Sequence, residues 1–199
     1  MNILVLGANG QVGSELRSAL DPVMQQGEGQ PQITFSGRSE LDLSDVPKIS
    51  HYLERVAPDI IVNAAAYTAV DEAESQSDVA FRINEAAVRE LALFCKRRKS
   101  YLIHISTDYV FDGKSDRPYI ESDPVGPSGV YGFSKLAGEK AIREVLDHHI
   151  ILRTSWVFGK SGSNFVKTML RLAKVKSELG VVSDQYGAPT SARGIAASV

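Results

Sequence analysis

The sequence predicts an α/β protein in which helices cover both faces of a doubly wound parallel sheet, and two observations support this fold class. Short apolar runs rich in Ile and Val recur along the chain, as is typical of strands buried on both faces of a parallel sheet. Helical patterns separate these runs, so strand and helix alternate. The 199 residues, 43% of them hydrophobic, are enough to fill one well-packed core.

The expected elements follow one another in a regular order. Strands are predicted over residues 2–7, 32–37, 59–65, 100–106 and 149–158. Helices are predicted after the first four strands, over residues 11–20, 45–56, 78–98 and 134–146. Residues 21–31 predict a polar loop. The basic cluster at 96–99 is expected at the C-terminus of a helix, where positive charge is favoured.

The pattern becomes less regular beyond Val157. It predicts a loop over 159–164, a helix over 165–176, a short strand over 180–184 and a Gly/Pro turn over 186–194. Residues 194–199 resemble the first turn of a further helix. We therefore expect the chain to be part of a longer protein.

Composition and charge restrict the classes of partner. A formal net charge of -2 and a pI near 6.1 give no general attraction to nucleic acid or to an anionic membrane. Apolar runs stay short of the roughly 20 residues that span a bilayer, and the N-terminus lacks a basic leader. The single cysteine, Cys95, cannot form an internal disulfide. We expect a cytoplasmic protein that binds neither nucleic acid nor membrane.

A glycine-rich turn follows the first predicted strand and opens the first helix. Gly7, Gly10 and Gly13 have the spacing Gly-x-x-Gly-x-x-Gly. Such glycines permit a tight turn, let the backbone approach a pyrophosphate and allow close helix packing, while the helix N-terminus offers unpaired N–H groups. Glycine turns also occur for purely structural reasons. The position directly after the first strand favours a dinucleotide site, and with it a Rossmann-type sheet.

The residue that follows the second strand bears on the choice of coenzyme. An acidic side chain there would bind the 2′-hydroxyl of a ribose, whereas Arg38 suits a 2′-phosphate. The sequence therefore favours NADPH without excluding NADH, and a solvated loop arginine is the alternative interpretation. Asp42 and Leu43 open the next segment and are expected to border the adenine.

A tyrosine and a lysine four residues apart point to carbonyl reduction. Tyr131 and Lys135 would share one face of a helix. A phenol, with an ordinary pKa of about 10, becomes an effective acid when a nearby cation stabilises the phenolate. Such pairs also occur by chance, but a buried strand ends at Thr107, where ligands of open α/β sheets bind. We expect Tyr131 to donate the proton, Lys135 to lower its pKa and bind a ribose hydroxyl, and Thr107 to hold the carbonyl.

Other residues have simpler interpretations. Small side chains close the third strand, so a coenzyme could lie against the backbone of Ala65 and Ala66. On residue type alone, Trp156 is interpreted as a core residue and His104 as a buried histidine with its hydrogen bonds satisfied. The remaining histidines, His51, His148 and His149, have no ligand-like companions, so we predict no metal site.

The chain resembles the dTDP-4-dehydrorhamnose reductase family of extended short-chain dehydrogenases/reductases in seven motifs spread over almost its entire length. They are "GANGQVGSEL", "NAAAYTAVDEAE", "STDYVFDG", "YGFSKLAGEKA", "RTSWVFG", "NFVKTMLRLAK" and "DQYGAPTSA". The resemblance implies hydride transfer from NADPH or NADH to C4 of dTDP-4-dehydro-β-L-rhamnose, giving dTDP-β-L-rhamnose for dTDP-rhamnose biosynthesis. We also expect a homodimer.

The resemblance also assigns residues. It implies a catalytic trio of Thr107, Tyr131 and Lys135, and substrate contacts by Thr107, Asp108 and Trp156. The coenzyme contacts that it implies are Gly10, Gln11, Val12, Asp42, Leu43, Ala66, Tyr67 and Thr68. Some members bind magnesium through glutamates. In this chain Glu15 matches one of the glutamate positions, but Arg193 occupies another, so we predict no metal.

Members of this family are longer than this chain. We therefore divide the chain into a dinucleotide-binding domain, residues 1–158, and a partial substrate-binding region, residues 159–199, and expect the substrate-binding portion to be incomplete.

Related functions remain open at this point. A sugar-nucleotide 4,6-dehydratase would typically have Asp-Glu after the threonine, whereas Asp108 is followed by Tyr109. Two alternatives keep the motifs: a reductase of another nucleotide-activated deoxyhexose, and a non-catalytic regulatory subunit resembling the β subunit of methionine adenosyltransferase. Substrate profiling would separate the first from the leading function, and co-purification with a synthetase would favour the second.

Overall fold

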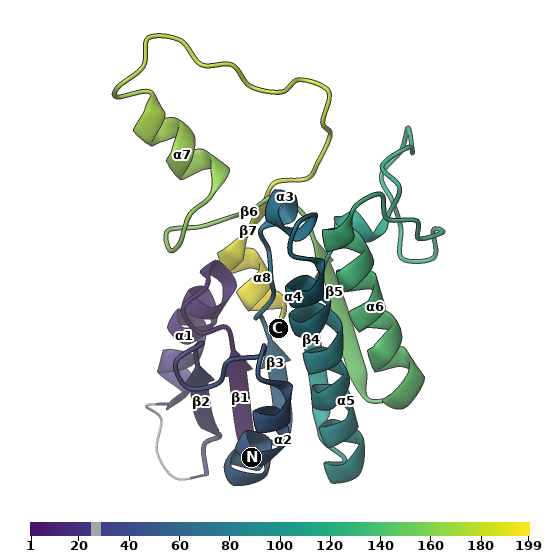
Figure 1. Ribbon diagram of the computed structural model, residues 1–199. Coiled ribbons are helices and arrows are strands. Elements are labelled where there is room, and N and C mark those ends of the chain that lie inside the picture. Colours follow the sequence, from purple (N-terminus) through teal and green to yellow (C-terminus); the bar gives the residue numbers. More distant parts are fainter. Residues whose placement is uncertain (25–28) are drawn as a thin grey trace.

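The computed structural model describes residues 1–24 and 29–199, and its centre is a five-stranded parallel sheet. The strands are β1 (Asn2–Leu6), β2 (Gln32–Ser36), β3 (Ile60–Asn63), β4 (Tyr101–Thr107) and β5 (His149–Thr154). Their order in space is β2-β1-β3-β4-β5 (Figure 1). The sheet grows outward from β1 in both directions, so the predicted doubly wound, Rossmann-type fold class is confirmed.

Helices cover both faces of this sheet (Figure 1). On one face lie α1 (Gln11–Met24) and α8 (Ala192–Ser198), and on the other lie α2 (Val46–Val56), α5 (Ala87–Arg98) and α6 (Val130–Val145). Alternate residues of β1 divide between the two cores: Leu4 and Leu6 pack with α2 and α5, and Val5 packs with α1 and α8. This division explains why the strands read as continuous apolar runs.

The long helix predicted over 78–98 is interrupted by a π-helical turn. It comprises α4 (Ser77–Phe81), the π-helical segment η1 (Arg82–Ala86) and α5, whose last turn carries the basic cluster as expected. Two short elements were not predicted, α3 (Val70–Ala73) and the 3₁₀ turn η2 (Asp108–Val110). Each follows the carboxyl end of a strand, so each helps to shape that edge of the sheet.

The prediction of one strand over 149–158 is wrong. The backbone divides into β5 and a separate β6 (Val157–Phe158), which pairs with β7 (Thr190–Ser191) in a two-stranded sheet. Trp156 lies between them with a φ of 45°, in the left-handed region, which a continuous strand cannot accommodate. The short strand predicted over 180–184 is also absent there, and Val181 and Val182 are exposed instead of paired.

The segment after β6 extends away from the sheet. Helix α7 (Phe165–Leu172) is shorter than the predicted 165–176, contributes no buried residue, and rises above the main body with the segment that follows it (Figure 1). The chain then returns to the body, where Ala192, Ile195 and Ala196 of α8 join the core that contains α1. The domain boundary after residue 158 stays a prediction. Helix α8, from the predicted substrate-binding region, packs with α1 of the predicted dinucleotide-binding domain.

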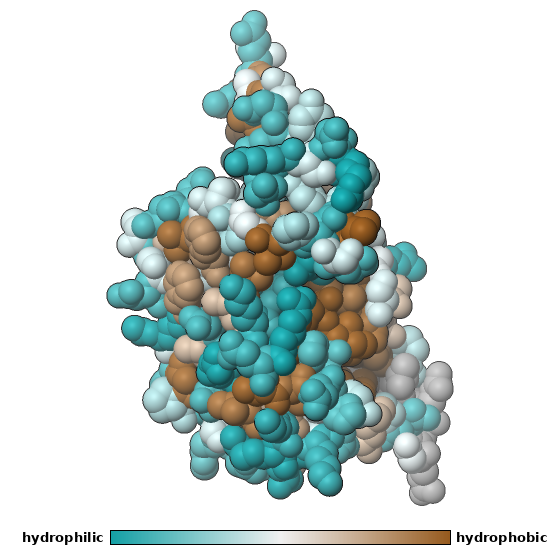
Figure 2. Space-filling view, turned by 90° about the vertical axis from the view of Figure 1, so that its right-hand side faces the viewer, coloured by the Kyte–Doolittle hydropathy of each residue, from teal (hydrophilic) through white to brown (hydrophobic). Residues whose placement is uncertain are grey.

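Other findings concern the surface and α1. Helix α1 continues to Met24, into the stretch predicted as a loop over 21–31, and residues 25–28 of that stretch lie outside the described residues. Seen from the side of α6 and β5, apolar residues lie among polar ones on the surface (Figure 2). Phe133 of α6 and Ile150 of β5 are half-exposed. Within the described ranges, no helix is long and apolar enough to cross a membrane.

Candidate functional site

A cavity of about 920 Å³ lies along the carboxyl ends of the parallel strands. It falls near the upper end of the range of typical ligand pockets, at the place where open α/β sheets bind ligands. All but one of the site residues predicted from the sequence line it. They are Gly7, Gly10, Gln11, Val12, Arg38, Asp42, Leu43, Ala65, Ala66, Tyr67, Thr68, Thr107, Asp108, Tyr131, Lys135 and Trp156.

The glycine turn forms one end of this cavity. Gly7 has a φ of 79°, and a Cβ added there would lie 2.7 Å from the carbonyl group of Ala64. Gly13, the one predicted residue that does not line the cavity, packs α1 against the turn, because an added Cβ would overlap the carbonyl oxygen of Gly7. The Gly10 N–H donates to that same oxygen at 2.9 Å. These features fit a turn that brings backbone close to a phosphate.

The side chain of Gln11 joins the turn to the segment after β6. Its Nε2 donates to the carbonyl oxygen of Val157 at 3.3 Å, and its Oε1 accepts a hydrogen bond from Asn164 at 2.9 Å. Asn164 also donates to the carbonyl oxygen of Gly159 and caps α7. The amide that the sequence predicted as a coenzyme contact therefore fixes the loop over 159–164 beside the start of α1.

Arg38 and Asp42 form an ion pair at the rim of the cavity. The Nε of Arg38 lies 3.0 Å from an Asp42 carboxylate oxygen, and the arginine side chain is 79% exposed. Ser44 donates to the other oxygen through its backbone N–H (2.9 Å) and its hydroxyl (2.7 Å). These bonds, with a smaller contribution from Arg38, lower the pKa of Asp42. The arginine is thus solvated, as the alternative interpretation held, but it also borders the cavity.

The predicted catalytic residues lie at the other end. Tyr131 and Lys135, from the first turns of α6, are 8% and 1% exposed, and Thr107 ends β4. The Thr107 hydroxyl accepts a hydrogen bond from the N–H of Tyr109 at 3.3 Å and donates to Asp108 at 3.2 Å. The fold therefore brings Thr107 to the same cavity as Tyr131 and Lys135, which lie more than 20 positions further along the sequence.

Burial governs the electrostatics of Tyr131 and Lys135. Burial raises the pKa of Tyr131, hydrogen bonding with Thr107 opposes this shift, and the charge of Asp108 adds to it. Burial also lowers the pKa of Lys135 to about 8, against the attraction of Glu139. Burial disfavours both charged forms in the chain by itself, and the lowering of the tyrosine pKa by Lys135 stays a prediction.

Trp156 is placed at the cavity and not in the core. The side chain is 48% exposed, so the interpretation from residue type alone is wrong. The ring packs closely over Gly187, leaving no room for a Cβ at that position. A left-handed backbone at a bulky residue is strained and is characteristic of functional sites.

Asn84 does not line the cavity but holds residues that do, a role not predicted from the sequence. It is 1% exposed and lies in the π-helical turn η1. Its side chain accepts from the N–H of Tyr67 (2.9 Å) and donates to the carbonyl oxygen of Tyr67 (3.0 Å) and to the hydroxyl of Ser134 (2.9 Å). It thereby ties the loop after β3 to α6. An asparagine inside a predicted helix, where it is disfavoured, was the available signal.

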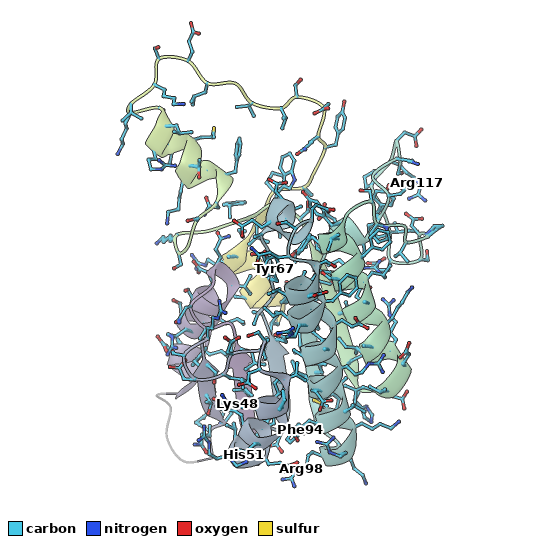
Figure 3. The ribbon with its side chains drawn as sticks, viewed as in Figure 1. Lys48, His51, Tyr67, Phe94, Arg98 and Arg117 are labelled. Atoms are coloured by element: carbon cyan, nitrogen blue, oxygen red, sulfur yellow. The ribbon has the colours of Figure 1, made fainter. Side chains whose placement is uncertain are left out.

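Tyr67 marks the carboxyl-end edge of the sheet. Figure 3 shows it at the end from which α3 begins, whereas Lys48, His51 and Arg98 lie toward the opposite end. Among residues 1–24 and 29–199, its phenol oxygen is the one buried side-chain polar atom without a hydrogen-bond partner. A second tyrosine that the sequence analysis did not select, Tyr109, contacts Tyr131 edge-on, with ring centroids 5.5 Å apart.

The described part of the chain contains no cluster of three or more His, Cys, Asp or Glu side chains that could hold a metal ion. His104 is fully buried, and both ring nitrogens have neighbours within hydrogen-bond distance, Asn63 and Lys135. The interpretation of His104 as a buried histidine with partners is therefore confirmed.

Comparison with known proteins agrees with this geometry. The sequence pattern of the RmlD substrate binding domain matches residues 1–199. The chain is 47% identical over 199 residues to a dTDP-4-dehydrorhamnose reductase of Escherichia coli, a match that covers 98% of this chain and 64% of that protein. The chain thus spans less than two thirds of the length of this relative.

Solved structures give the same result. A dTDP-4-dehydrorhamnose reductase ortholog from Clostridium acetobutylicum superposes with a TM-score of 0.92 at 38% identity, covering 100% of this chain and 68% of that one. A dTDP-4-dehydrorhamnose reductase from Bacillus anthracis, solved in complex with NADP, superposes with a TM-score of 0.89 at 36% identity, covering 99% and 68%.

Proposed function

The chain belongs to the RmlD substrate binding domain family, and on this premise we propose that the protein containing it is a dTDP-4-dehydrorhamnose reductase. The reaction would reduce C4 of dTDP-4-dehydro-β-L-rhamnose to give dTDP-β-L-rhamnose. The observation that carries the proposal is that Thr107, Tyr131 and Lys135 line the same cavity as the glycine turn. A redox coenzyme and a proton donor would therefore meet at one substrate.

The residues fit a nicotinamide dinucleotide. A pyrophosphate would bind at the turn of Gly7 and Gly10, where added side chains would block the close approach of the backbone. A 2′-phosphate would pair with Arg38, so we propose NADPH as the preferred coenzyme and NADH as the weaker one. This assignment agrees with the NADP bound to the Bacillus anthracis relative. When bound, the reduced coenzyme supplies the hydride.

The chain's own residues would position the carbonyl and supply the proton. Thr107 would donate a hydrogen bond to the C4 carbonyl oxygen, which gains negative charge during reduction. Tyr131 would transfer its phenolic proton to that oxygen. The ammonium of Lys135 would stabilise the phenolate and bind a ribose hydroxyl. In this chain the pKa of Tyr131 is raised, so the phenol holds its proton at neutral pH, as a proton donor must.

Asp108 and Trp156 would contact the sugar. Asp108 is held in place by the hydroxyl of Ser155, which donates to its carboxylate at 2.7 Å. The partly exposed ring of Trp156 offers an apolar surface of the kind against which sugars pack.

A homodimer stays a prediction, which light scattering of the full-length protein would test.

The test uses full-length protein mixed with enzymatically made dTDP-4-dehydrorhamnose, and it follows the loss of absorbance of NADPH and of NADH. The proposal predicts oxidation of the coenzyme, faster with NADPH, and none with Tyr131→Phe above a small residual rate. If the protein reduced another nucleotide-linked 4-keto sugar faster than dTDP-4-dehydrorhamnose, it would be a reductase of different specificity. Absence of coenzyme oxidation with every sugar, together with co-purification of a synthetase, would point to the regulatory subunit.

A further inference from the structure

A buried chain of polar contacts leads from β3 to the catalytic helix. Asn63 Nδ2 lies 3.0 Å from His104 Nδ1, and His104 Nε2 lies 3.2 Å from Lys135 Nζ. Asn63 and His104 are 0% exposed and Lys135 is 1% exposed, so all three side chains are shielded from water. The proposed function uses only Lys135 among them, which leaves the role of the other two unexplained.

The hydrogen bonds of Asn63 determine which ring nitrogen of His104 carries the proton. Asn63 Oδ1 accepts the backbone N–H of Ala65 at 3.1 Å, which fixes the amide so that its Nδ2 faces the imidazole. An amide nitrogen can only donate, so Nδ1 of His104 must be the acceptor. A neutral imidazole then carries its proton on Nε2, the nitrogen that faces Lys135.

The protonation state of His104 is settled by its surroundings. Burial lowers the pKa of His104 well below its ordinary value, and the charge of Lys135 lowers it further, so the ring is neutral at physiological pH. An Nε2–H group can donate to a neutral amine but repels an ammonium. The second partner of Lys135, the carbonyl oxygen of Ile105 at 2.8 Å, accepts from either form.

We propose that His104 is a positioning residue for Lys135. Held by Asn63 with its proton on Nε2, it donates a hydrogen bond to the uncharged form of the lysine amine, so the ammonium that the proposed function uses gives up its proton at a lower pH. The Asn63–His104 pair thereby sets the pH at which Lys135 becomes charged. The consequence for proton donation by Tyr131 rests on the proposed function, but the tautomer and the charge of Lys135 do not.

Few other ionisable groups face this chain of contacts. On α6 they are Tyr131 and Glu139, and Glu139 is neutralised by Arg153 of β5, at 2.7 Å, and by Arg143. Cys95 of α5, on the same side of the sheet, has its pKa raised to about 12 by burial and stays uncharged. The attraction of Glu139 raises the pKa of Lys135, but burial outweighs it and leaves the value near 8. His104, whose Nε2 lies 3.2 Å from Lys135 Nζ, is thus in direct contact with the lysine and able to change its pKa further.

The first measurement is nitrogen NMR of the full-length protein labelled with ¹⁵N. The proposal predicts that His104 is neutral with its proton on Nε2 and an unprotonated Nδ1. A proton on Nδ1 would overturn it, because Nε2 would then accept from the ammonium. This result does not depend on enzymatic activity, so failure of this inference and failure of the reductase assignment are separable.

The second measurement is the pKa of Lys135, followed by NMR of its terminal carbon and nitrogen. In Asn63→Asp a carboxylate replaces the amide, can still accept from Ala65, and would draw the imidazole proton to Nδ1. We expect the pKa of Lys135 to rise by at least about one pH unit, a tenfold gain in proton affinity. His104→Gln, whose amide oxygen can face the ammonium, should raise it as well.

A double variant distinguishes an effect passed through the imidazole of His104 from direct attraction between the carboxylate introduced by Asn63→Asp and the Lys135 ammonium. When Asn63→Asp is combined with His104→Leu, the rise should disappear, because the imidazole that transmits it is gone. A full rise in the double variant would refute a role for His104. His51→Gln, at an exposed position of α2, is the matched histidine control and should leave Lys135 unchanged. If a variant does not fold, the tautomer of His104 in the wild-type protein still tests the proposal.

Discussion

The substitution Gly138→Ala tests whether the π-helical turn is held tightly against the catalytic helix. Gly138 faces η1 from α6, and a Cβ added there would lie closer than 3.0 Å to the backbone carbonyl oxygen of Asn84, with the carbonyl carbon at 3.3 Å. Real Cβ atoms do not approach other atoms so closely, and backbone cannot rotate away as a side chain can. The substitution must therefore move η1 away from α6.

Two opposing effects set the magnitude. Alanine is favoured over glycine inside a helix by about 1 kcal/mol. Overpacking of a filled core costs about 1–3 kcal/mol, and weakening of the Asn84 bonds to Tyr67 and Ser134 costs roughly 1 kcal/mol for each bond lost. The cost exceeds the gain, so we expect the free energy of unfolding to fall by about 2 kcal/mol, or Tm by about 4–8 °C.

The assay is urea denaturation of the full-length protein, followed by circular dichroism, with coenzyme affinity measured in parallel by fluorescence. Coenzyme affinity should also fall, because Asn84 holds the loop of Tyr67 at the cavity. Gly180→Ala is the matched control, since a Cβ there meets nothing within 4 Å, and it should change stability by less than about 1 kcal/mol. If Gly138→Ala proved as stable as the wild type, the close packing of η1 on α6 would be refuted.

Three further substitutions test the buried ion pair of Glu139, the proposed 2′-phosphate site at Arg38 and the proposed proton donor Tyr131. Glu139→Gln breaks a buried ion pair with Arg153 and should lower the free energy of unfolding by about 3 kcal/mol at pH 7. Because the pKa of Glu139 is lowered from 4.5 in the folded state, this difference should shrink as pH falls below that value; a pH-independent difference would contradict the assignment. Arg38→Asp should weaken NADPH binding more than NADH binding in titrations, and equal losses would count against the 2′-phosphate site. Tyr131→Phe should reduce turnover by about two to four orders of magnitude with little change in coenzyme affinity, and retention of a tenth of the wild-type rate with chemistry rate-limiting would require another proton donor.

The core of the fold was predictable because its signals are local. The inner strands β1, β3 and β4 are largely buried and are rich in Ile, Val and Leu, and polar residues occur where β3 and β4 end. Thr107 and the glycine turn were found for this reason, since strand ends of a parallel sheet converge on one edge. The cavity that they share follows from topology alone.

The predictions that were wrong or missing concern residues whose structure depends on partners distant in the sequence. Val181 and Val182 resemble a strand, but no neighbouring strand pairs with them, and pairing is not encoded in a short apolar run. At the break, the ring of Trp156 packs on Gly187, a partner 31 positions away in the sequence. The roles of Asn84 and His104 also come from contacts across the fold that periodicity cannot reveal.

The proposed function requires that hydride passes from a nicotinamide coenzyme to C4 of the sugar in the cavity that contains Tyr131. The direct measurement incubates full-length protein with dTDP-4-dehydrorhamnose and NADPH deuterated at the transferable position, then locates deuterium in the product by NMR. We expect the wild type to form dTDP-rhamnose with deuterium at C4, and Tyr131→Phe to form almost none of this product. Deuterium at another carbon, or a product formed equally well by the variant, would contradict it.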